Sequence, residues 1–107
     1  MRFSGIPSEE RAIEIAMSIK EGEWTLCENQ SCQSANREEA VAWLKNIVSQ
    51  ISTWKKQNPA IPPATCFVFV HTPSEPVAFK IYDLSSLGCS FELSPPRWKA
   101  YLKGYEI

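Results

Sequence analysis

The fold is decided by one run of apolar residues, Cys66-Phe67-Val68-Phe69-Val70-His71. Both alternating sets of side chains in this run are apolar, which is typical of a strand covered on both faces. The three prolines in the preceding stretch, 58–64, exclude a helix there because they remove backbone donors. We therefore expect a central strand at 66–71.

Further strands are predicted on both sides of this run. Residues 77–82 alternate between apolar and other side chains after a turn at 72–76, which predicts a hairpin. Residues 89–93 alternate in the same way and predict a third strand of an antiparallel meander. Residues 24–27 predict a short strand upstream. A right-handed parallel crossover would join it to the central strand.

Three helices are expected around these strands. The first follows Ser8 as N-cap and ends at Gly22. The second runs from about Asn36 to about Lys56. The third starts at Ser94-Pro95-Pro96 and stops at Gly104. The second helix has the clearest period, with one apolar face formed by Ala40, Leu44, Ile47, Val48 and Ile51.

The predicted fold class is α+β. We expect a four-stranded mixed sheet, mostly an antiparallel meander, packed with about three helices in the order α-β-α-β-β-β-α. The 107 residues suffice for one core, so residues 1–107 are expected to form a single domain. Residues 1–7 are expected to form an extended N-terminal arm.

Composition and charge narrow the classes of function. Eleven basic and twelve acidic residues give a formal net charge of −1, which gives no electrostatic reason to expect nucleic acid as partner. No stretch has the apolar length of a membrane span, and residues 1–7 have no apolar core of a secretory signal. We therefore expect a cytoplasmic protein without a membrane partner.

The cysteines and the single histidine are the candidates for chemistry. In a cytoplasmic protein the four cysteines are expected to be reduced thiols. Cys27 and Cys32 flank a turn and could form a redox-sensitive pair. Their spacing, without a second close pair, does not favour zinc. No phosphate-binding or dinucleotide motif is present, so no cofactor is expected.

The four tryptophans suggest an interaction surface, since tryptophan is enriched at interface hot spots. Trp43 and Trp54 lie at the margin of the second helix's apolar face, and Trp24 begins a strand expected at the sheet edge. Glu10 and Glu14 belong to a polar line on the first helix. The leading hypothesis is a non-catalytic protein-binding module of the inhibitor, immunity or antitoxin type. It would mask a cognate toxin or enzyme. The glutamates would attract the partner electrostatically, and the tryptophan rings would form the main contacts in the complex.

Two other classes of function, and one further partner, stay open. A small thiol-dependent enzyme would use His71 with Cys66 or Cys89, and Asp83 would orient the ring. A binder of single-stranded nucleic acid would use the aromatic and basic residues near the C-terminal end, namely Arg97, Trp98, Lys99 and Tyr101. A second copy of the chain is also a possible partner.

Overall fold

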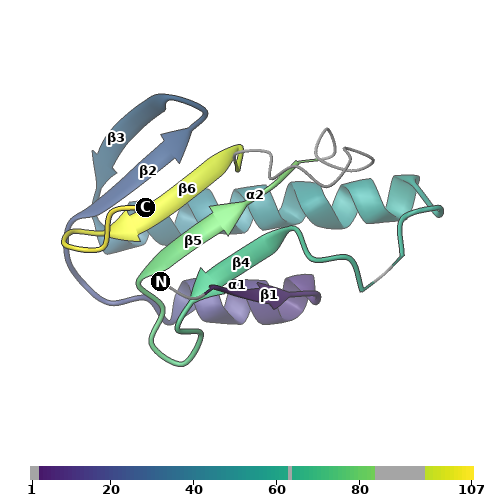
Figure 1. The fold of residues 1–107 in the computed structure, drawn as a ribbon, viewed down its shortest axis with the longest axis horizontal. Helices are drawn as coiled ribbons and strands as arrows, with labels where there is room; N and C mark the ends of the chain where they lie inside the picture. The colour runs from purple at the N-terminus through teal and green to yellow at the C-terminus, as the bar shows by residue number, and fades with distance from the viewer. Residues whose placement is uncertain (1–2, 63, 84–95) are drawn as a thin grey trace.

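A single antiparallel sheet of six strands organises the molecule (Figure 1). The computed structural model describes residues 3–62, 64–83 and 96–107. The spatial order of the strands is β1-β4-β5-β6-β2-β3. Their bounds are β1 (Phe3–Ile6), β2 (Trp24–Glu28), β3 (Ser31–Ala35), β4 (Val68–His71), β5 (Ala78–Ile81) and β6 (Trp98–Leu102).

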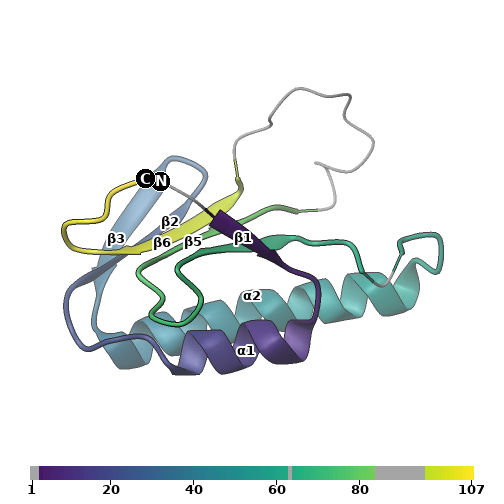
Figure 2. The same ribbon diagram turned by 60° about the horizontal axis from the view of Figure 1, so that its bottom comes forward.

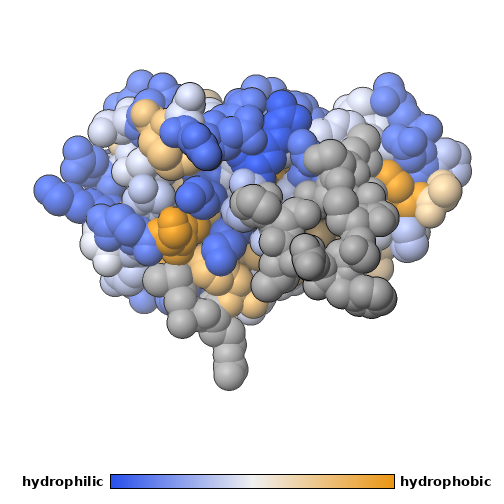
Figure 3. Space-filling model, turned by 45° about the horizontal axis from the view of Figure 1, so that its top comes forward, coloured by the Kyte–Doolittle hydropathy of each residue, from blue (hydrophilic) through white to orange (hydrophobic). Residues whose placement is uncertain are grey.

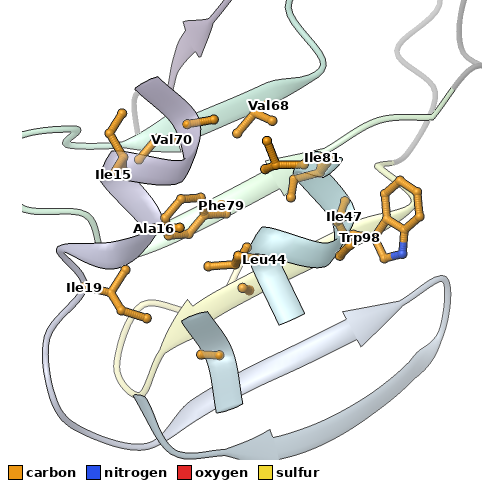
Figure 4. Packing of buried hydrophobic residues seen from close by; sticks show 14 of the residues in the cluster. Ile15, Ala16, Ile19, Leu44, Ile47, Val68, Val70, Phe79, Ile81 and Trp98 are labelled. Atoms are coloured by element: carbon orange, nitrogen blue, oxygen red, sulfur yellow. The ribbon is translucent and has the colours of Figure 1, made fainter. Parts of the chain in front are cut away.

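Two helices, α1 (Glu9–Met17) and α2 (Arg37–Gln57), lie side by side on the same face of the sheet (Figure 2). Between the helices and the sheet lies one hydrophobic core, part of which is drawn in Figure 4. Ile15 and Leu44 point from the helices towards Val70 and Phe79 of the sheet. The opposite sheet face carries no helix in the described part of the chain.

Both helices begin at side-chain caps that the sequence predicts. The Ser8 hydroxyl accepts a hydrogen bond from the backbone N–H of Arg11, and Asn36 and Glu39 form a reciprocal capping box at the start of α2. The end predicted for the first helix is wrong, because α1 stops at Met17 and not at Gly22. The Arg37 guanidinium donates to the Met17 and Ile19 carbonyls, so α2 supplies the cation that the last turn of α1 lacks.

The expected α+β class and the predicted apolar face of the second helix are confirmed. The four-stranded count is wrong. Residues 3–6 of the expected arm form β1 and pair with β4, and residues 31–35, where no strand is expected from the sequence, form β3. The polar sequence of β3 has no apolar alternation. Asn29, at a φ of 56°, turns the chain so that β3 returns antiparallel to β2.

The predicted last helix is a strand. Residues 98–102 form β6, which pairs with β5 on one side and with β2 on the other. The apolar spacing of Trp98, Tyr101 and Leu102 fits a helix, but the alternation of buried Trp98 and Ala100 with half-buried neighbours fits a strand. A segment of five residues nucleates a helix poorly. As a strand between β5 and β2, the same segment forms backbone hydrogen bonds along both of its edges.

Two further expectations about the sheet are wrong, and one lies outside the described residues. The strand at 24–27 is not joined to the central strand by a parallel crossover, because β5 and β6 lie between β2 and β4 and every pairing is antiparallel. β4 is covered by helices on one face only, and Phe69 and His71 on its other face are half-buried. The strand expected at 89–93 and the cap expected at Ser94 fall within 84–95, outside the described residues.

Cys27 and Cys32 face each other across β2 and β3 and form a disulfide. Their predicted proximity is confirmed, and the expectation of a reduced thiol is wrong for this pair. Cys27 is buried, whereas Cys32 is exposed on the edge strand. Among the described helices, none combines the length and apolarity needed to cross a membrane.

Candidate binding face

The sheet face opposite the helices is built from two rows of directly paired residues, and we call it the open face. Residues paired across an antiparallel ladder point to the same side of the sheet. The first row is Phe3, His71, Ala78, Tyr101, Thr25 and Ser34. The second row is Gly5, Phe69, Lys80, Lys99, Cys27 and Cys32. Neither row contains an aspartate or a glutamate.

Aromatic rings cluster on the β1–β4 side of the open face. Phe3 meets the His71 imidazole edge-on, with 5.7 Å between the centroids. Phe69 meets Tyr82 in the same way at 5.6 Å. Tyr105, which follows β6, lies 6.5 Å from His71 and is 41% exposed. Both pairs have the edge-to-face geometry that aromatic rings favour.

Two lysines occupy the middle of the open face. Lys80 of β5 is directly opposite Lys99 of β6. The Lys80 ammonium lies over the Phe3 ring, 4.5 Å from its centroid, and that of Lys99 donates to the backbone oxygen of Ile107 at 3.4 Å. In residues 3–62, 64–83 and 96–107, neither ammonium pairs with an aspartate or glutamate side chain.

Gly5 allows the rings of the open face to lie close to β1. A Cβ atom at this position would approach the Phe69 ring to 3.1 Å and the Cys66 sulfur to 3.0 Å, both closer than ordinary contact. The Phe69 ring therefore occupies the space that a side chain on β1 would fill. Phe69 keeps its orientation only while position 5 has no side chain.

His71 ends β4 beside the aromatic cluster, and Thr72 is the first residue after the strand. Thr72 has a φ of 56°, a conformation rare for a β-branched residue. Its hydroxyl lies 2.8 Å from His71 Nδ1 and shares a hydrogen bond with the ring. The same turn ends in Glu75, whose carboxylate pairs with Lys20 beyond the end of α1. That pairing lowers the pKa of Glu75 and raises the pKa of Lys20.

Trp24 does not lie where the sequence hypothesis needs it. β2 is an interior strand, and the Trp24 side chain is fully buried against Phe79, with its indole N–H donated to the Lys20 carbonyl at 3.0 Å. The expectation that Trp24 starts an edge strand is therefore wrong, and its ring cannot touch a partner in this structure.

Trp43 and Trp54 are both half-buried on α2, at the margin of the core as predicted. Trp54 stacks on Trp98 with 6.1 Å between the ring centroids and meets Phe67 edge-on, so it closes one end of the core. Trp43 borders a surface hollow of about 340 Å³ together with Leu26 and Gln33. Of these two rings, Trp43 is the one beside a hollow that a partner could enter.

Glu10 and Glu14 are exposed on α1. Glu10 lines a surface hollow between the two helices, and Glu14 lies 3.7 Å from the Arg11 guanidinium. They lie in the helix layer, on the other side of the sheet from the open face (Figure 2). The structure therefore does not bring the acids together with the aromatic and basic residues of the sheet.

The residues proposed for nucleic-acid binding are divided between the two sides of the sheet. Lys99 and Tyr101 share the open face because they are two positions apart in a strand. Trp98 faces the helices and is buried. Arg97 stacks on the Trp98 ring and pairs with Asp83 and Glu28 at the end of β6.

The thiol-enzyme hypothesis relies on Cys66 or Cys89, and of these two the structure describes Cys66. The disulfide occupies Cys27 and Cys32, and Cys89 lies outside the described residues. Cys66 keeps a free thiol, which donates weakly to the Ala64 carbonyl. No cluster of three metal-ligating side chains occurs within the described part of the chain.

The sequence reasoning missed Phe3, Phe69, Lys80 and Tyr82 as members of one surface. A local signal existed in β4, where Phe69 and His71 alternate with the core residues Val68 and Val70. On the side of the molecule drawn in Figure 3, hydrophobic patches lie among hydrophilic groups and do not form one continuous apolar area.

Comparison with known proteins finds a relative along almost the whole chain. An uncharacterized protein of Aquifex aeolicus (strain VF5) is 44% identical over 108 residues, covering 99% of this chain and 88% of the relative. This chain belongs to the family of that protein. No family model and no solved structure matches the chain. The argument for function therefore starts from the geometry of the open face.

Proposed function

We propose that this protein is a non-catalytic binding protein that acts through the open face of its sheet. The observation that carries the proposal is the pairing of the aromatic cluster with Lys80 and Lys99 on a face that no described helix covers. A face with this composition offers aromatic rings together with two lysines that pair with no aspartate or glutamate side chain in the described part of the chain. Its strands are rigid elements, so the side chains are positioned before a ligand arrives.

A comparison of two charge variants tests which side of the molecule binds. The double variant Lys80→Gln/Lys99→Gln alters the open face, and Glu10→Gln/Glu14→Gln alters α1 by the same number of charges. Each variant and the unchanged protein are immobilised, exposed to lysate of the source organism, and washed at low salt. Retained material is quantified with and without nuclease treatment.

The expected result is that the lysine variant loses the retained material and the glutamate variant keeps it. Loss with the glutamate variant alone, or retention of nothing by the unchanged protein, would contradict the proposal. Circular dichroism of both variants checks that the fold is intact.

Partner masking through the helix layer is the second candidate function. It corresponds to an inhibitor, immunity or antitoxin-type protein that covers a cognate toxin or enzyme. Glu10 and Glu14 are exposed on α1, and Trp43 borders a hollow, which supports this candidate. It predicts that Trp43→Ala removes a retained protein while the lysine variant retains it.

The cytoplasmic location and a homodimer also remain proposals. A reducing cytosol tends to open disulfides, so the state of Cys27 and Cys32 in cells bears directly on the location. Alkylation of the cells before lysis, followed by mass spectrometry, measures that state. Light scattering of the purified protein over a range of concentrations measures whether two copies associate.

A further inference from the structure

Lys80 and Lys99 place two like charges directly opposite each other on the open face. Directly opposed residues on neighbouring strands have Cβ atoms roughly 5 Å apart, and like charges in this position repel. Within the described residues the Lys80 ammonium contacts the Phe3 ring, and that of Lys99 contacts the main-chain oxygen of Ile107, the last of the 107 residues, whose terminal carboxylate carries a negative charge. An anionic group placed between the two lysines would remove the repulsion.

The rings beside the lysines favour an anion that also carries planar groups. In the second row Phe69 lies next to Lys80. In the first row Tyr101 and His71 lie two strands apart, with Ala78 of β5 between them. Protein carboxylates could neutralise the lysines, but they have no planar surface of base size to stack on these side chains.

We propose that the ligand of the open face is single-stranded nucleic acid. Single strands expose base faces for stacking and carry a phosphate at each step, and proteins that bind them combine aromatic platforms with a basic groove. In a duplex the bases are already stacked on each other, so the rings of the open face could not reach them. The inference rests on the proposed function and adds the class of ligand.

The net charge of −1 makes a specific prediction about salt. Long-range attraction of a polyanion is absent, so the electrostatic contribution comes from local contacts alone. In a plot of log binding constant against log salt concentration, each phosphate of a single strand that the protein neutralises contributes about −0.7 to the slope. Two lysine contacts therefore give a slope of about −1.4, and Lys80→Gln or Lys99→Gln each reduces its magnitude by about 0.7.

Fluorescence anisotropy with labelled oligothymidine and oligouridine of about twelve nucleotides tests the proposal, a length within the roughly 4–16 nucleotides that one OB-fold domain engages. A duplex of equal length is titrated beside them. The variants are Lys80→Gln/Lys99→Gln, Phe69→Leu, and the matched control Lys45→Gln/Lys56→Gln on the exposed side of α2. Urea unfolding of each variant confirms its fold.

Several results would support the inference. The unchanged protein and the α2 control bind single strands with equal affinity. The affinity of the open-face lysine variant is at least about tenfold lower, and that of Phe69→Leu at least about fivefold lower. Phe69→Leu leaves the salt slope unchanged, because it removes stacking and no charge. The duplex binds more weakly than either single strand.

Other results would overturn it. If neither oligonucleotide binds at low salt, or if the α2 control loses as much affinity as the open-face variant, single-stranded nucleic acid is not the ligand. If the open-face lysines are still required to retain a nuclease-resistant protein from lysate, the proposed function stands and only the ligand class is wrong. If that retention is also absent, both proposals fail.

Discussion

Replacing Trp24 with alanine removes the largest fully buried side chain of the described core. Truncation of a buried tryptophan costs about 3–5 kcal/mol through lost burial and the cavity that remains. The hydrogen bond from the indole N–H to the Lys20 carbonyl adds about 1 kcal/mol. A chain of 107 residues has a free energy of unfolding of about 5–16 kcal/mol, at about 0.05–0.15 kcal/mol per residue. Trp24→Ala should therefore remove between a quarter and all of the stability.

Urea unfolding followed by far-ultraviolet circular dichroism measures this loss. Trp24→Phe keeps an aromatic ring and should cost about 1–2 kcal/mol, mostly from the lost hydrogen bond and a smaller cavity. Trp43→Ala serves as control and should cost about 1–2 kcal/mol, because its ring already borders solvent. Equal unfolding midpoints for Trp24→Ala and Trp43→Ala would refute the assignment of Trp24 to the core.

Three other predictions concern caps, cross-links and charge. The Cys27–Cys32 disulfide closes a loop of only a few residues, so its reduction should lower the free energy of unfolding by about 2 kcal/mol in the loop-entropy account. Thermal unfolding with and without reductant measures this loss, and an unchanged midpoint would contradict it. Asn36→Ala should cost about 1 kcal/mol in urea unfolding, and a cost near zero would mean that the capping box contributes nothing. Lys20 lowers the pKa of the Glu75 carboxyl group below its ordinary value of 4.5. Their ion pair therefore stabilises the fold at pH values above 4.5, and this stabilisation is lost as the pH falls through the pKa of Glu75 in the folded protein. Glu75→Gln should flatten stability against pH in that acidic range, and an unchanged pH profile would show that the pair is not formed in solution.

Local patterns were enough to predict α2 and its buried face. The period of its apolar residues is long and unambiguous, and Asn36 with Glu39 marks its start. β6 could not be assigned in the same way, because five residues satisfy both a helical and a strand period. Its two neighbouring strands decide between them, and those neighbours are distant in the sequence.

The open face shows the same limit. Lys99 and Tyr101 were recognised for their chemistry but assigned to a helix, in which positions two apart point in different directions. In β6 they share a face, and only the register of β5 against β6 brings Lys80 opposite Lys99. Trp24 was misplaced because nothing near it in the sequence indicates that β6 covers the other edge of β2.

The position of β6 has a consequence for biosynthesis. The hairpins β2–β3 and β4–β5 are joined in the sheet only through β6, which the ribosome makes after both. Until residues 98–102 emerge, the nascent chain exposes one open edge on each hairpin and an incomplete core. Folding of this domain should therefore wait until residues 98–102 have been made, and termination before residue 98 should yield a chain that chaperones and proteases treat as unfolded.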